Sequence, residues 1–522
     1  MELERSCGIL LHISSLPSKE AVGNLGEGAY KFIDFLAASS QRYWQILPYH
    51  PVGYGYSPYQ TYSAFAGNHL FIDLANLVEL GFISKDQVEM YYQKVAGERQ
   101  SKNIRGDVAD YPLAYKEKMP ILRQAFTQYC EEKSEKLRYI EEEFQQFQEE
   151  NRFWLDDYAL FMALKTHFNQ RPWYQWDENI AKRKPKSIRY YQDTLREELA
   201  LHQFLQFIFF RQWQRLKEYA NEHHINIVGD IPIFVAHDSA DLWANPEYFR
   251  LDEKGDLEVV AGVPPDYFSE TGQKWGNPLY DWKALAKQGY EWWIQRFDML
   301  FKYVDIVRID HFRGFAAFWE IPAEEETAKN GHWVTGPGRD FFQTLEKSLG
   351  EVDVIAENLG VITPDVEKLR EEFNFPGMKV LLFMMETGPL ETFRSLFQNH
   401  QVLYSGTHDN DTLVGWWQKI IKGNKPVVAD LKRYWQITDQ MTSQEVCWRL
   451  LKIVCKSNNQ LVLFPLQDVL GLDNRARMNT PGTIAGNWIW RAQEEDLDEL
   501  TVSRLNELAA STGRANNKKR GG

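Results

Sequence analysis

Short apolar runs recur along the chain, and each is bounded by Gly, Pro, Asp or Asn. The runs cover residues 8–12, 43–47, 225–228, 304–309, 352–356, 378–383, 402–405 and 461–464. Short runs of this kind, rich in β-branched residues, are typical of buried strands. Amphipathic segments fall between most of them, as at residues 290–297 and 363–370, where Thr363 can cap a helix with Pro364 at its first position. Eight strands that alternate with helices predict a (β/α)8 barrel.

Two intervals between the predicted strands are longer than a single crossover. Residues 65–200, between the second and third strands, are highly charged, and aromatic residues recur at helical spacing through 153–161, which predicts a largely helical insertion. A second, loop-rich insertion covers residues 235–290. We therefore expect one barrel domain over residues 1–510, with no C-terminal β-domain, followed by a polar, disordered tail over residues 511–522.

Composition and charge exclude several classes of partner. The 522 residues carry a net charge of −14, whereas a general nucleic-acid binder needs a basic face. No apolar run approaches the length that spans a bilayer, and the acidic N-terminus differs from a signal peptide, so we expect a cytoplasmic protein. The four cysteines, Cys7, Cys130, Cys447 and Cys455, are widely spaced, which predicts neither a disulfide framework nor a zinc site. The sequence does not indicate an oligomeric state.

Aromatic residues make up 14% of the chain, including 18 Trp. Most are expected to serve the core, but a group recurs in loops beside Gly, Pro and Asn, at residues 52–59 and 273–278. Loop aromatics offer flat apolar faces on which the C–H face of a sugar ring can stack. The pattern indicates a carbohydrate ligand without specifying which one.

Three of the predicted strands end at a carboxylate, and these are Asp310, Glu357 and Asp409. In a barrel, catalytic groups lie where strands end and βα-loops begin. Strand alternation puts Arg308 on the same face as Asp310, and a neighbouring arginine favours an ionised carboxylate. Breaking a glycosidic bond needs one carboxylate ionised and another protonated at neutral pH. The three residues meet that need if their strand ends converge.

Each of these residues also has a simpler interpretation. An Asp at a strand end is often a helix cap or a structural ion-pair partner, but three carboxylates at one barrel mouth, beside Gly, Asn or His, favour chemistry. His311 and His408 adjoin two of them and could hydrogen-bond sugar hydroxyls. Metal binding is the other use of Asp/His groups. Neither an H-E-x-x-H nor an EF-hand spacing occurs, so we expect no metal and no cofactor.

Several long segments, in order, resemble the 4-α-glucanotransferases (amylomaltases, or disproportionating enzymes), a family of the α-amylase clan. The resemblance runs from residues 8–17 through 229–235 and 261–278 to 475–483, and it includes the three carboxylate motifs. It implies a retaining barrel enzyme of starch or glycogen metabolism. Such an enzyme moves a segment of α-1,4-glucan to the 4-hydroxyl of glucose or of a maltooligosaccharide, so these sugars are the expected partners.

The resemblance also implies a role for each matching residue. Asp310 would be the nucleophile, Glu357 the general acid/base, and Asp409 would hydrogen-bond the reacting sugar and stabilise the transition state. Asp230 matches a clan motif too, although it could simply support the barrel mouth. The residues implied to contact substrate are Tyr54, Tyr59, Arg308, His311, His408 and Asn479, together with Asp266, Phe268, Gln273 and Trp275 from a loop expected to cover the cleft.

Two alternatives remain open at the level of sequence. The first is an α-amylase-type hydrolase of α-1,4-glucans, in which water takes the glucosyl group; the loop at 261–278 and the tyrosines within 54–59 are the candidates for excluding water. The second is a non-catalytic glucan-binding barrel, against which Asp310 and Glu357 argue. In a retaining enzyme these two carboxyl groups are expected to lie roughly 5–5.5 Å apart.

Overall fold

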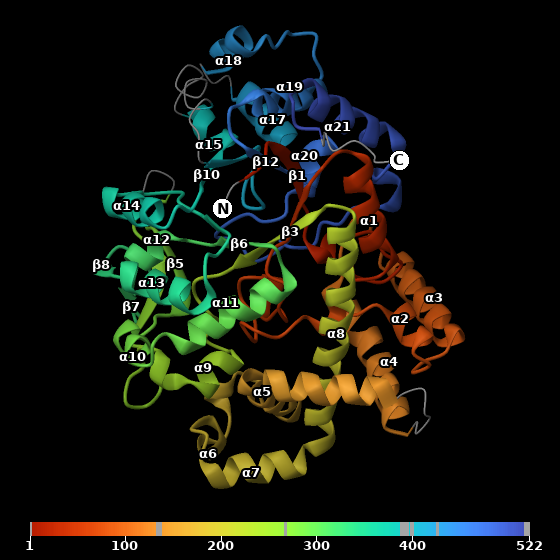
Figure 1. The fold of residues 1–522 in the computed structure, drawn as a ribbon, viewed down its shortest axis with the longest axis vertical. Coiled ribbons are helices and arrows are strands. Elements are labelled where there is room, and N and C mark those ends of the chain that lie inside the picture. The colour runs from red at the N-terminus through yellow and green to blue at the C-terminus, as the bar shows by residue number, and fades with distance from the viewer. Residues whose placement is uncertain are drawn as a thin grey trace.

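Eight parallel strands close into a barrel in the order β1-β12-β11-β10-β9-β6-β3-β2, as seen in a computed structural model (Figure 1). The model describes residues 3–131, 138–265, 269–386, 396, 401–423 and 427–515, apart from the side chain of Tyr54. The barrel strands are β1 (Ser6–Leu10), β2 (Tyr43–Gln45), β3 (Asn226–Ile231), β6 (Ile306–Ile309), β9 (Val354–Ala356), β10 (Gly377–Val380), β11 (Gln401–Tyr404) and β12 (Leu461–Pro465). Each coincides with one predicted run, and the (β/α)8 prediction is confirmed.

One strand boundary differs from the prediction. The run at 378–383 is a strand only as far as Val380, and α15 (Leu381–Glu386) follows without a loop. The residues of α15, LLFMME, are mostly apolar and therefore resemble a buried strand in the sequence. None of them is branched at Cβ, however. Leu, Met and Glu are good helix formers, and this preference decides the conformation.

The barrel strands are buried on both faces, as parallel strands between a core and a layer of helices must be. Ile9, Val228, Val307 and Ile355 are fully buried. Because neighbouring strands run parallel in fixed register, their last residues meet at one edge of the barrel. The β3–β6 register pairs Asp230 with Arg308, which places two charged side chains next to each other at that edge.

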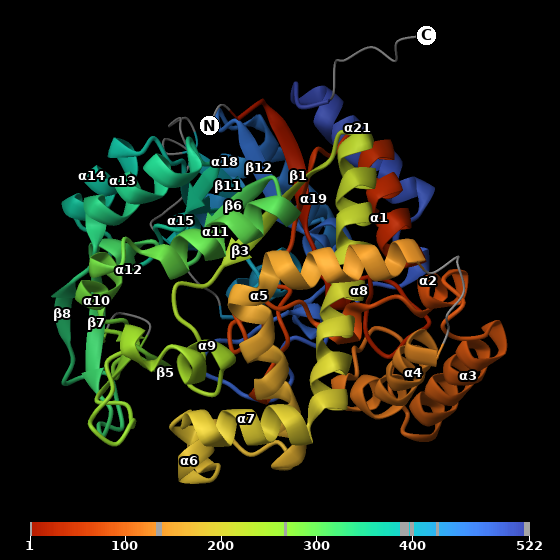
Figure 2. The same cartoon turned by 60° about the horizontal axis from the view of Figure 1, so that its bottom comes forward.

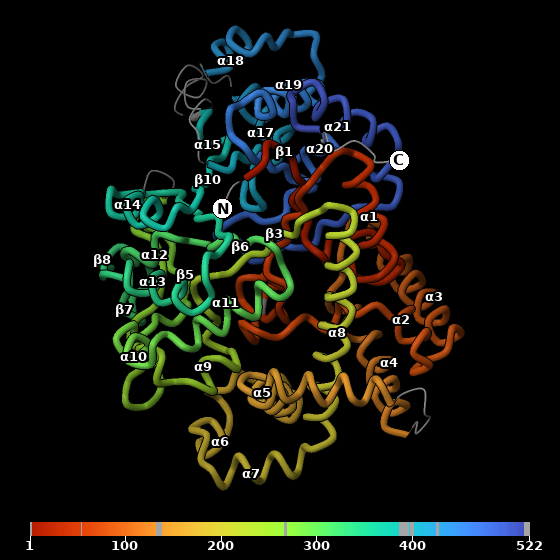
Figure 3. The backbone as a smooth tube through the Cα atoms, in the orientation of Figure 1, coloured from red at the N-terminus to blue at the C-terminus, as the bar shows by residue number. Residues whose placement is uncertain are grey.

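The interval between β2 and β3 is helical, as predicted. Figure 3 shows the chain of this insertion from α2 to α7 and its return to the barrel strand β3 along α8 (Arg196–Glu222). The other α-helices of the interval are α2 (Leu74–Glu79), α3 (Lys85–Ser101), α4 (Tyr111–Glu131), α5 (Arg138–His167), α6 (Glu178–Ala181) and α7 (Pro185–Thr194). Aromatic side chains hold the insertion together: Phe144 of α5 stacks on Phe207 of α8 at 5.1 Å between ring centroids.

A second sheet lies beside the barrel, and two of its strands fall within the insertion predicted at 235–290. Strands β4 (Val259–Val263) and β5 (Gln273–Pro278) form an antiparallel sheet with β7 (Ala317–Pro322) and β8 (His332–Thr335), in the order β5-β4-β7-β8. The segment also contains α9 (Ala240–Ala244) and α10 (Trp282–Lys287). The frequent Gly and Pro residues hid the strands, because the partners β7 and β8 come from a distant part of the sequence.

The helices that surround the barrel include α1 (Glu27–Ala38), α11 (Glu291–Tyr303), α13 (Gly338–Leu349), α14 (Pro364–Glu372), α17 (Leu413–Lys422), α19 (Ser443–Lys456) and α21 (Glu499–Ser511). The two that were predicted at 290–297 and 363–370, α11 and α14, begin within one residue of those segments. At α14, Thr363 is the N-cap residue and Pro364 is at the first helical position, as predicted. The Thr363 side chain makes no capping bond, however; its hydroxyl accepts a hydrogen bond from Arg313 Nη1 at 3.1 Å.

The predicted tail starts too early. Helix α21 continues to Ser511, and Arg514 is fully buried, where its guanidinium donates to the carbonyl oxygens of Ser6 (3.0 Å) and Cys455 (2.7 Å). A single arginine in a polar stretch gives no sign in the sequence that it fills a cluster of carbonyl groups. Residues 516–522 lie outside the described part. Of the helices in the described part, none combines the length and the apolar character needed to cross a membrane.

Candidate active site

An arginine lies between two carboxylates at the ends of β3 and β6. Arg308 Nη1 donates to both carboxylate oxygens of Asp230 at 2.7 Å, and its Nη2 donates to Asp310 Oδ1 at 2.9 Å. Arg308 and Asp230 are almost entirely buried. Burial alone would lower the pKa of Arg308, but the charges of Asp230 and Asp310 raise it well above its ordinary value. The guanidinium is therefore permanently charged and fixes the position of the Asp310 carboxylate.

Tyr59 completes this arrangement from the loop after β2. Its hydroxyl donates to Asp230 Oδ2 at 2.7 Å. Burial, and next to it the charge of Asp230, raises the pKa of Tyr59 well above its ordinary value, so the hydroxyl stays protonated. Asp230 is thus held by Arg308 and Tyr59 together. This arrangement agrees with the interpretation in which Asp230 supports the barrel mouth.

Glu357 follows β9, and backbone groups rather than charged side chains hold its carboxylate. The N–H of His311 donates to Glu357 Oε2 at 2.7 Å, and the N–H of Leu359 donates to Oε1 at 3.0 Å. His311 has φ +52°, in the left-handed region that non-glycine residues seldom adopt. That conformation occurs in the turn directly after Asp310, and it presents the N–H to Glu357. The same turn therefore links the two carboxylates.

The environment of Glu357 raises its pKa to about 7. Burial is the main cause, the negative charge of Asp310 adds to it, and Arg308 and the two backbone N–H groups oppose it. A carboxyl group with a pKa near neutrality can both give and take a proton at that pH. Asp310 and Glu357 are therefore two neighbouring carboxyl groups in different electrostatic environments, which is the condition for a separate nucleophile and acid/base.

The third carboxylate, Asp409, lies after β11 and is held from the loop at 474–479. Asn479 Nδ2 donates to Asp409 Oδ1 at 2.6 Å, and the Asn479 N–H donates to the carbonyl of His408 at 3.0 Å. Arg477 donates to the carbonyl of Asp409 (2.6 Å) and to that of Asn479 (2.7 Å). These bonds fix the backbone on both sides of Asp409, while its side chain stays 45% exposed.

A group of aromatic rings connects the part of the site around Asp409 with the Arg308–Asp230 pair. Tyr59 stacks on His408 with 5.3 Å between centroids and 21° between planes. Trp488 packs against both rings, at 5.9 Å from Tyr59 and 5.7 Å from His408. Since Tyr59 also binds Asp230, the aromatic group extends from Asp409 to the Arg308–Asp230 pair.

On the other side of the site, β5 brings two residues of the predicted covering loop next to His311. Trp275 packs edge-on against His311 at 4.9 Å, and Trp275 Nε1 donates to Gln273 Oε1 at 3.2 Å. Burial lowers the pKa of His311 to about 4; Asp310 opposes this shift and Arg313 adds to it. The imidazole is therefore neutral at physiological pH and can offer one donor and one acceptor.

Comparison with known proteins identifies the family. The family model for 4-alpha-glucanotransferase matches residues 11–497. The chain belongs to the 4-alpha-glucanotransferase family. It is 47% identical to the 4-alpha-glucanotransferase of Synechocystis sp. over 98% of this chain and 99% of that protein, and 46% identical to the 4-alpha-glucanotransferase of Thermus thermophilus over 98% and 100%. The structure of amylomaltase from Streptococcus agalactiae in complex with acarbose superposes with a TM-score of 0.90, at 36% identity and over 98% and 100% of the two chains.

Most of the residues that the sequence suggested for this family's site lie together in the structure. They form two groups of direct contacts, which the peptide bond between Asp310 and His311 joins. One group contains Asp310, Arg308, Tyr59, His408, Asn479 and Asp409, and the other contains Glu357, His311, Trp275 and Gln273. Asp266 and Phe268 lie outside the described residues, as does the side chain of Tyr54. Within the described part of the chain, no group of three or more His, Cys, Asp or Glu side chains is placed to hold a metal ion.

Sequence reasoning missed Trp488 and Arg477. Trp488 lies two residues before another tryptophan, Trp490, and only the folded loop brings it to Tyr59 and His408. Its backbone φ of +65° lies in the left-handed region, which no sequence pattern predicts for this residue. Arg477 was within a matched motif, but its contacts to Asp409 depend on the approach of two loops. The signal available for both was their position within or close to a family motif.

Proposed function

We propose that this chain is a 4-α-glucanotransferase that moves a segment of an α-1,4-glucan to the 4-hydroxyl of glucose or of a maltooligosaccharide, by a retaining double displacement. The observation that carries the mechanism is the contrast between Asp310, ion-paired with Arg308, and Glu357, whose pKa is raised to about 7 next to it. A retaining enzyme needs one carboxylate that attacks and one carboxylic acid that protonates the leaving oxygen.

In the first half-reaction, a carboxylate oxygen of Asp310 forms a bond to the anomeric carbon. Glu357 gives its proton to the glycosidic oxygen as the bond from that oxygen to the anomeric carbon breaks. The products are a covalent glucosyl–Asp310 ester and a shortened glucan with a free 4-hydroxyl. Arg308 orients the attacking oxygen through its 2.9 Å bond to Asp310, because a nucleophile gains most from a fixed geometry.

In the second half-reaction, Glu357 acts as a base. Once Asp310 is an ester, its negative charge is gone, and that charge is one of the causes that raise the pKa of Glu357. The pKa of Glu357 therefore falls in the intermediate, where the group has to be ionised. Glu357 takes the proton of the acceptor 4-hydroxyl, whose oxygen attacks the anomeric carbon and releases Asp310. Two inversions give net retention.

The remaining residues are proposed to bind the sugars. Asp409, held by Asn479, would accept hydrogen bonds from the hydroxyls of the reacting glucose, and these bonds would strengthen in the transition state. The rings of Tyr59 and Trp275 would provide apolar faces for sugar rings. The family resemblance extends this role to His408, His311, Gln273, Asp266, Phe268 and Tyr54. We propose the cytoplasm as the compartment of the enzyme.

The product pattern from maltotriose tests the proposal. A transferase makes glucose and a ladder of longer oligomers while the total number of reducing ends stays constant. A hydrolase would raise the number of reducing ends, and a non-catalytic barrel would leave maltotriose unchanged. Chromatography of the products together with a reducing-end assay separates the three outcomes, and a steady rise of reducing ends without longer oligomers would contradict the proposal.

A further inference from the structure

The segment that carries Asp409 leads from β11 to α17 and is called the Asp409 loop below; it consists of residues 405–412. Strands β11 and β12 are neighbours in the barrel, as Figure 2 shows, and the short helix α20 (Leu466–Val469) follows β12 directly. Asp468 of α20 therefore lies close to the Asp409 loop, although the two segments are distant in the sequence.

The side chain of Asp468 binds both ends of the Asp409 loop. Its Oδ2 accepts a hydrogen bond from the Ser405 hydroxyl at 2.7 Å, and its Oδ1 accepts one from the backbone N–H of Leu413, also at 2.7 Å. Ser405 is the first residue after β11, and Leu413 is the first residue of α17. One carboxyl group thus ties the beginning of the loop to the residue that follows its end.

Helix α17 has a cap of its own and does not need Asp468 for this purpose. Thr412 is the N-cap residue, and its hydroxyl accepts a hydrogen bond from the backbone N–H of Gly415 at 3.1 Å. Asn474 Oδ1 accepts a further bond from the Thr412 N–H at 3.0 Å. The contact of Asp468 to Leu413 is therefore additional to the capping of the helix.

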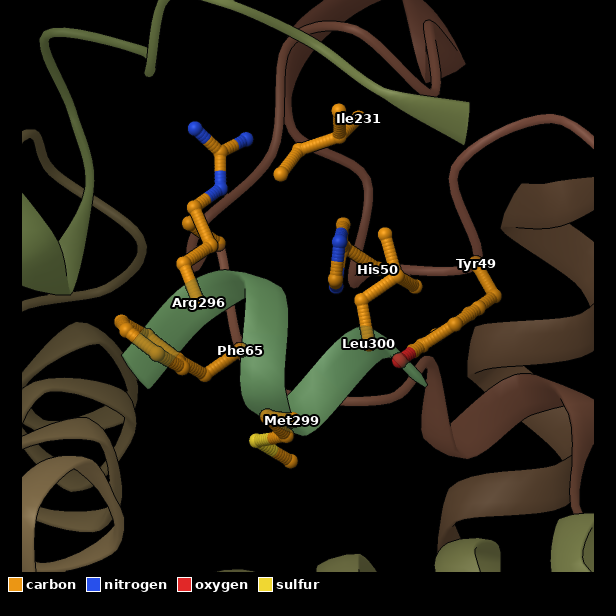
Figure 4. Close-up of a pocket in the computed structure, with 8 residues that line it drawn as sticks. Tyr49, His50, Phe65, Ile231, Arg296, Met299 and Leu300 are labelled. Carbon is orange, nitrogen blue, oxygen red and sulfur yellow. The ribbon is translucent and has the colours of Figure 1, made fainter. Parts of the chain in front are cut away.

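Asp468 is buried, and no positive charge compensates it. Burial raises its pKa to about 6, and the Leu413 N–H and the Ser405 hydroxyl oppose this shift; no cation does so among the described residues. Burial also raises the pKa of Asp241 to about 6, but there Arg296, shown in Figure 4 beside a cavity of about the size of one water, contributes a positive charge. A buried carboxylate without a counter-charge costs folding free energy, so stability does not account for Asp468.

Within the Asp409 loop, the position of Asp409 depends on the loop backbone more than that of His408 does. The ring of His408 packs against Trp488 at 5.7 Å between centroids. The side chain of Asp409 is 45% exposed. Asn410 Oδ1 accepts bonds from the N–H and the hydroxyl of Thr407, at 2.8 and 2.9 Å, which makes the loop internally rigid. A shift at either end of such a loop moves Asp409 with it.

We propose that Asp468 is a positioning residue for the reaction: by holding both ends of the Asp409 loop, it places the Asp409 carboxylate against the hydroxyls of the reacting glucose. The inference rests on the proposed function for the role of Asp409. Asp468 is itself buried and acts through the loop. Because the bonds made by Asp409 strengthen in the transition state, loss of its placement lowers kcat more than it changes KM.

Kinetics of three variants on maltotriose test the proposal. Asp468→Ala removes both contacts and should lower kcat about 10²-fold while KM changes less than about threefold. Ser405→Ala removes one contact only, leaves the buried carboxyl in place, and should lower kcat about 10-fold. Asp468→Asn should restore kcat to within about threefold, because its amide can accept from the Leu413 N–H and donate to the Ser405 hydroxyl oxygen. Unchanged kcat in Asp468→Ala, or an Asp468→Asn variant as impaired as Asp468→Ala, overturns the proposal.

The matched control is Asp73→Ala, at the start of α2 in the helical insertion. Asp73 Oδ2 accepts a bond from the backbone N–H of Asn76 at 2.9 Å, and burial raises the pKa of Asp73 as it does that of Asp468. The control should have a lower melting temperature and an unchanged kcat. A loss of kcat in Asp73→Ala equal to that in Asp468→Ala would show a general effect of destabilisation and overturn the proposal.

A double-mutant cycle with Asp409 separates positioning from an independent structural role. If Asp468 acts through Asp409, adding Asp468→Ala to Asp409→Ala should lower kcat by less than about threefold, whereas independent effects multiply. Timed incubations with maltotriose measure all four proteins. If Asp468→Ala does not fold, the same cycle with Ser405→Ala gives the decision, because it keeps the carboxyl group. Multiplied losses overturn the proposal.

The cycle also distinguishes a failure of this inference from a failure of the proposed function. The product pattern of the unmodified enzyme from maltotriose judges transfer by itself. A fully active Asp409→Ala would remove the role of Asp409 from the proposed function, and the role of Asp468 with it. Multiplied losses together with an impaired Asp409→Ala would leave the proposed function intact and overturn only the role of Asp468.

Discussion

The two sides of the barrel mouth treat a buried carboxylate in opposite ways. At the ends of β3 and β6, Asp230 and Asp310 share the guanidinium of Arg308, which supplies a full positive charge. At the end of β9, Glu357 receives two backbone N–H groups and feels the negative charge of Asp310, and its pKa rises to about 7. The nearest donor thus sets the electrostatic environment of each carboxylate, and in the proposed mechanism this separates the group that attacks from the group that transfers a proton.

The largest effect should come from removing the charged member of the pair. We expect Asp310→Asn to lower kcat on maltotriose by about 10⁴-fold or more, because no nucleophile remains for the covalent step. Chromatography of the products after timed and prolonged incubations measures the loss in kcat. Asp298→Asn, on the outer helix α11, is the control and should be fully active. Substantial transfer by Asp310→Asn would mean that the attacking group is another residue.

Removing the acid/base should cost less and depend on the leaving group. We expect Glu357→Gln to lower kcat on maltotriose by about 10²–10⁴-fold. With an α-maltosyl fluoride donor, the fluoride leaves without protonation, so the first half-reaction should recover much of its rate. Glu149→Gln, an exposed change on α5, serves as the control. The rate of the first half-reaction is measured as the initial burst of released glucose or fluoride, and an equal loss of this rate with both donors would contradict the role of Glu357 as the general acid.

Weakening the shared arginine should reduce both activity and stability. The single ammonium group of lysine cannot bind both oxygens of Asp230 and also reach Asp310. We therefore expect Arg308→Lys to lower kcat on the order of 10²-fold. Its melting temperature should fall, because a buried carboxylate loses part of its compensation. The control is Arg475→Lys, because Arg475 makes a similar contact to Asp473 but its side chain is 80% exposed. This change should have little effect on kcat or on the melting temperature. A fully active Arg308→Lys would show that the orientation of Asp310 does not depend on this ion pair.

The smallest effect is a change in pH dependence. The general acid must carry its proton in the free enzyme, so kcat/KM should fall as pH rises through about 7, the pKa of Glu357. In Asp310→Asn a charge that raises this pKa is missing, and the pKa of Glu357 should be lower. Carboxyl titration by NMR or infrared difference spectroscopy of both proteins measures the shift. An unchanged or higher pKa in Asp310→Asn would contradict the electrostatic comparison between the two sides.

The sequence was sufficient for features that depend on local pattern. Each of the eight barrel strands has its own apolar run. Asp310 and Glu357 follow such a run directly and Asp409 follows one after a short loop, so their meeting follows from the barrel geometry. The antiparallel sheet was missed, because β4 pairs not only with β5 but also with β7, which lies about 60 residues further along the chain. Trp488 and Arg514 were missed for the same reason. Each is a single side chain whose position depends on the packing of distant segments.

The pKa of Glu357 could not be foreseen either. It depends on burial and on two backbone N–H groups, one of them presented by the left-handed turn at His311. A sequence shows the carboxylate but neither the turn nor the depth of burial. The separation of the Asp310 and Glu357 carboxyl groups, roughly 5–5.5 Å for a retaining enzyme, remains a prediction.

The most direct test of the central claim is to trap the covalent intermediate and locate it in the chain. Glu357→Gln incubated with α-maltosyl fluoride should accumulate a maltosyl-enzyme, since the fluoride leaves unaided while the second half-reaction lacks its base. Mass spectrometry of peptides should find the added maltosyl group on Asp310. An adduct on Asp409 or Asp230, or release of product with inverted configuration and no adduct, would contradict the account.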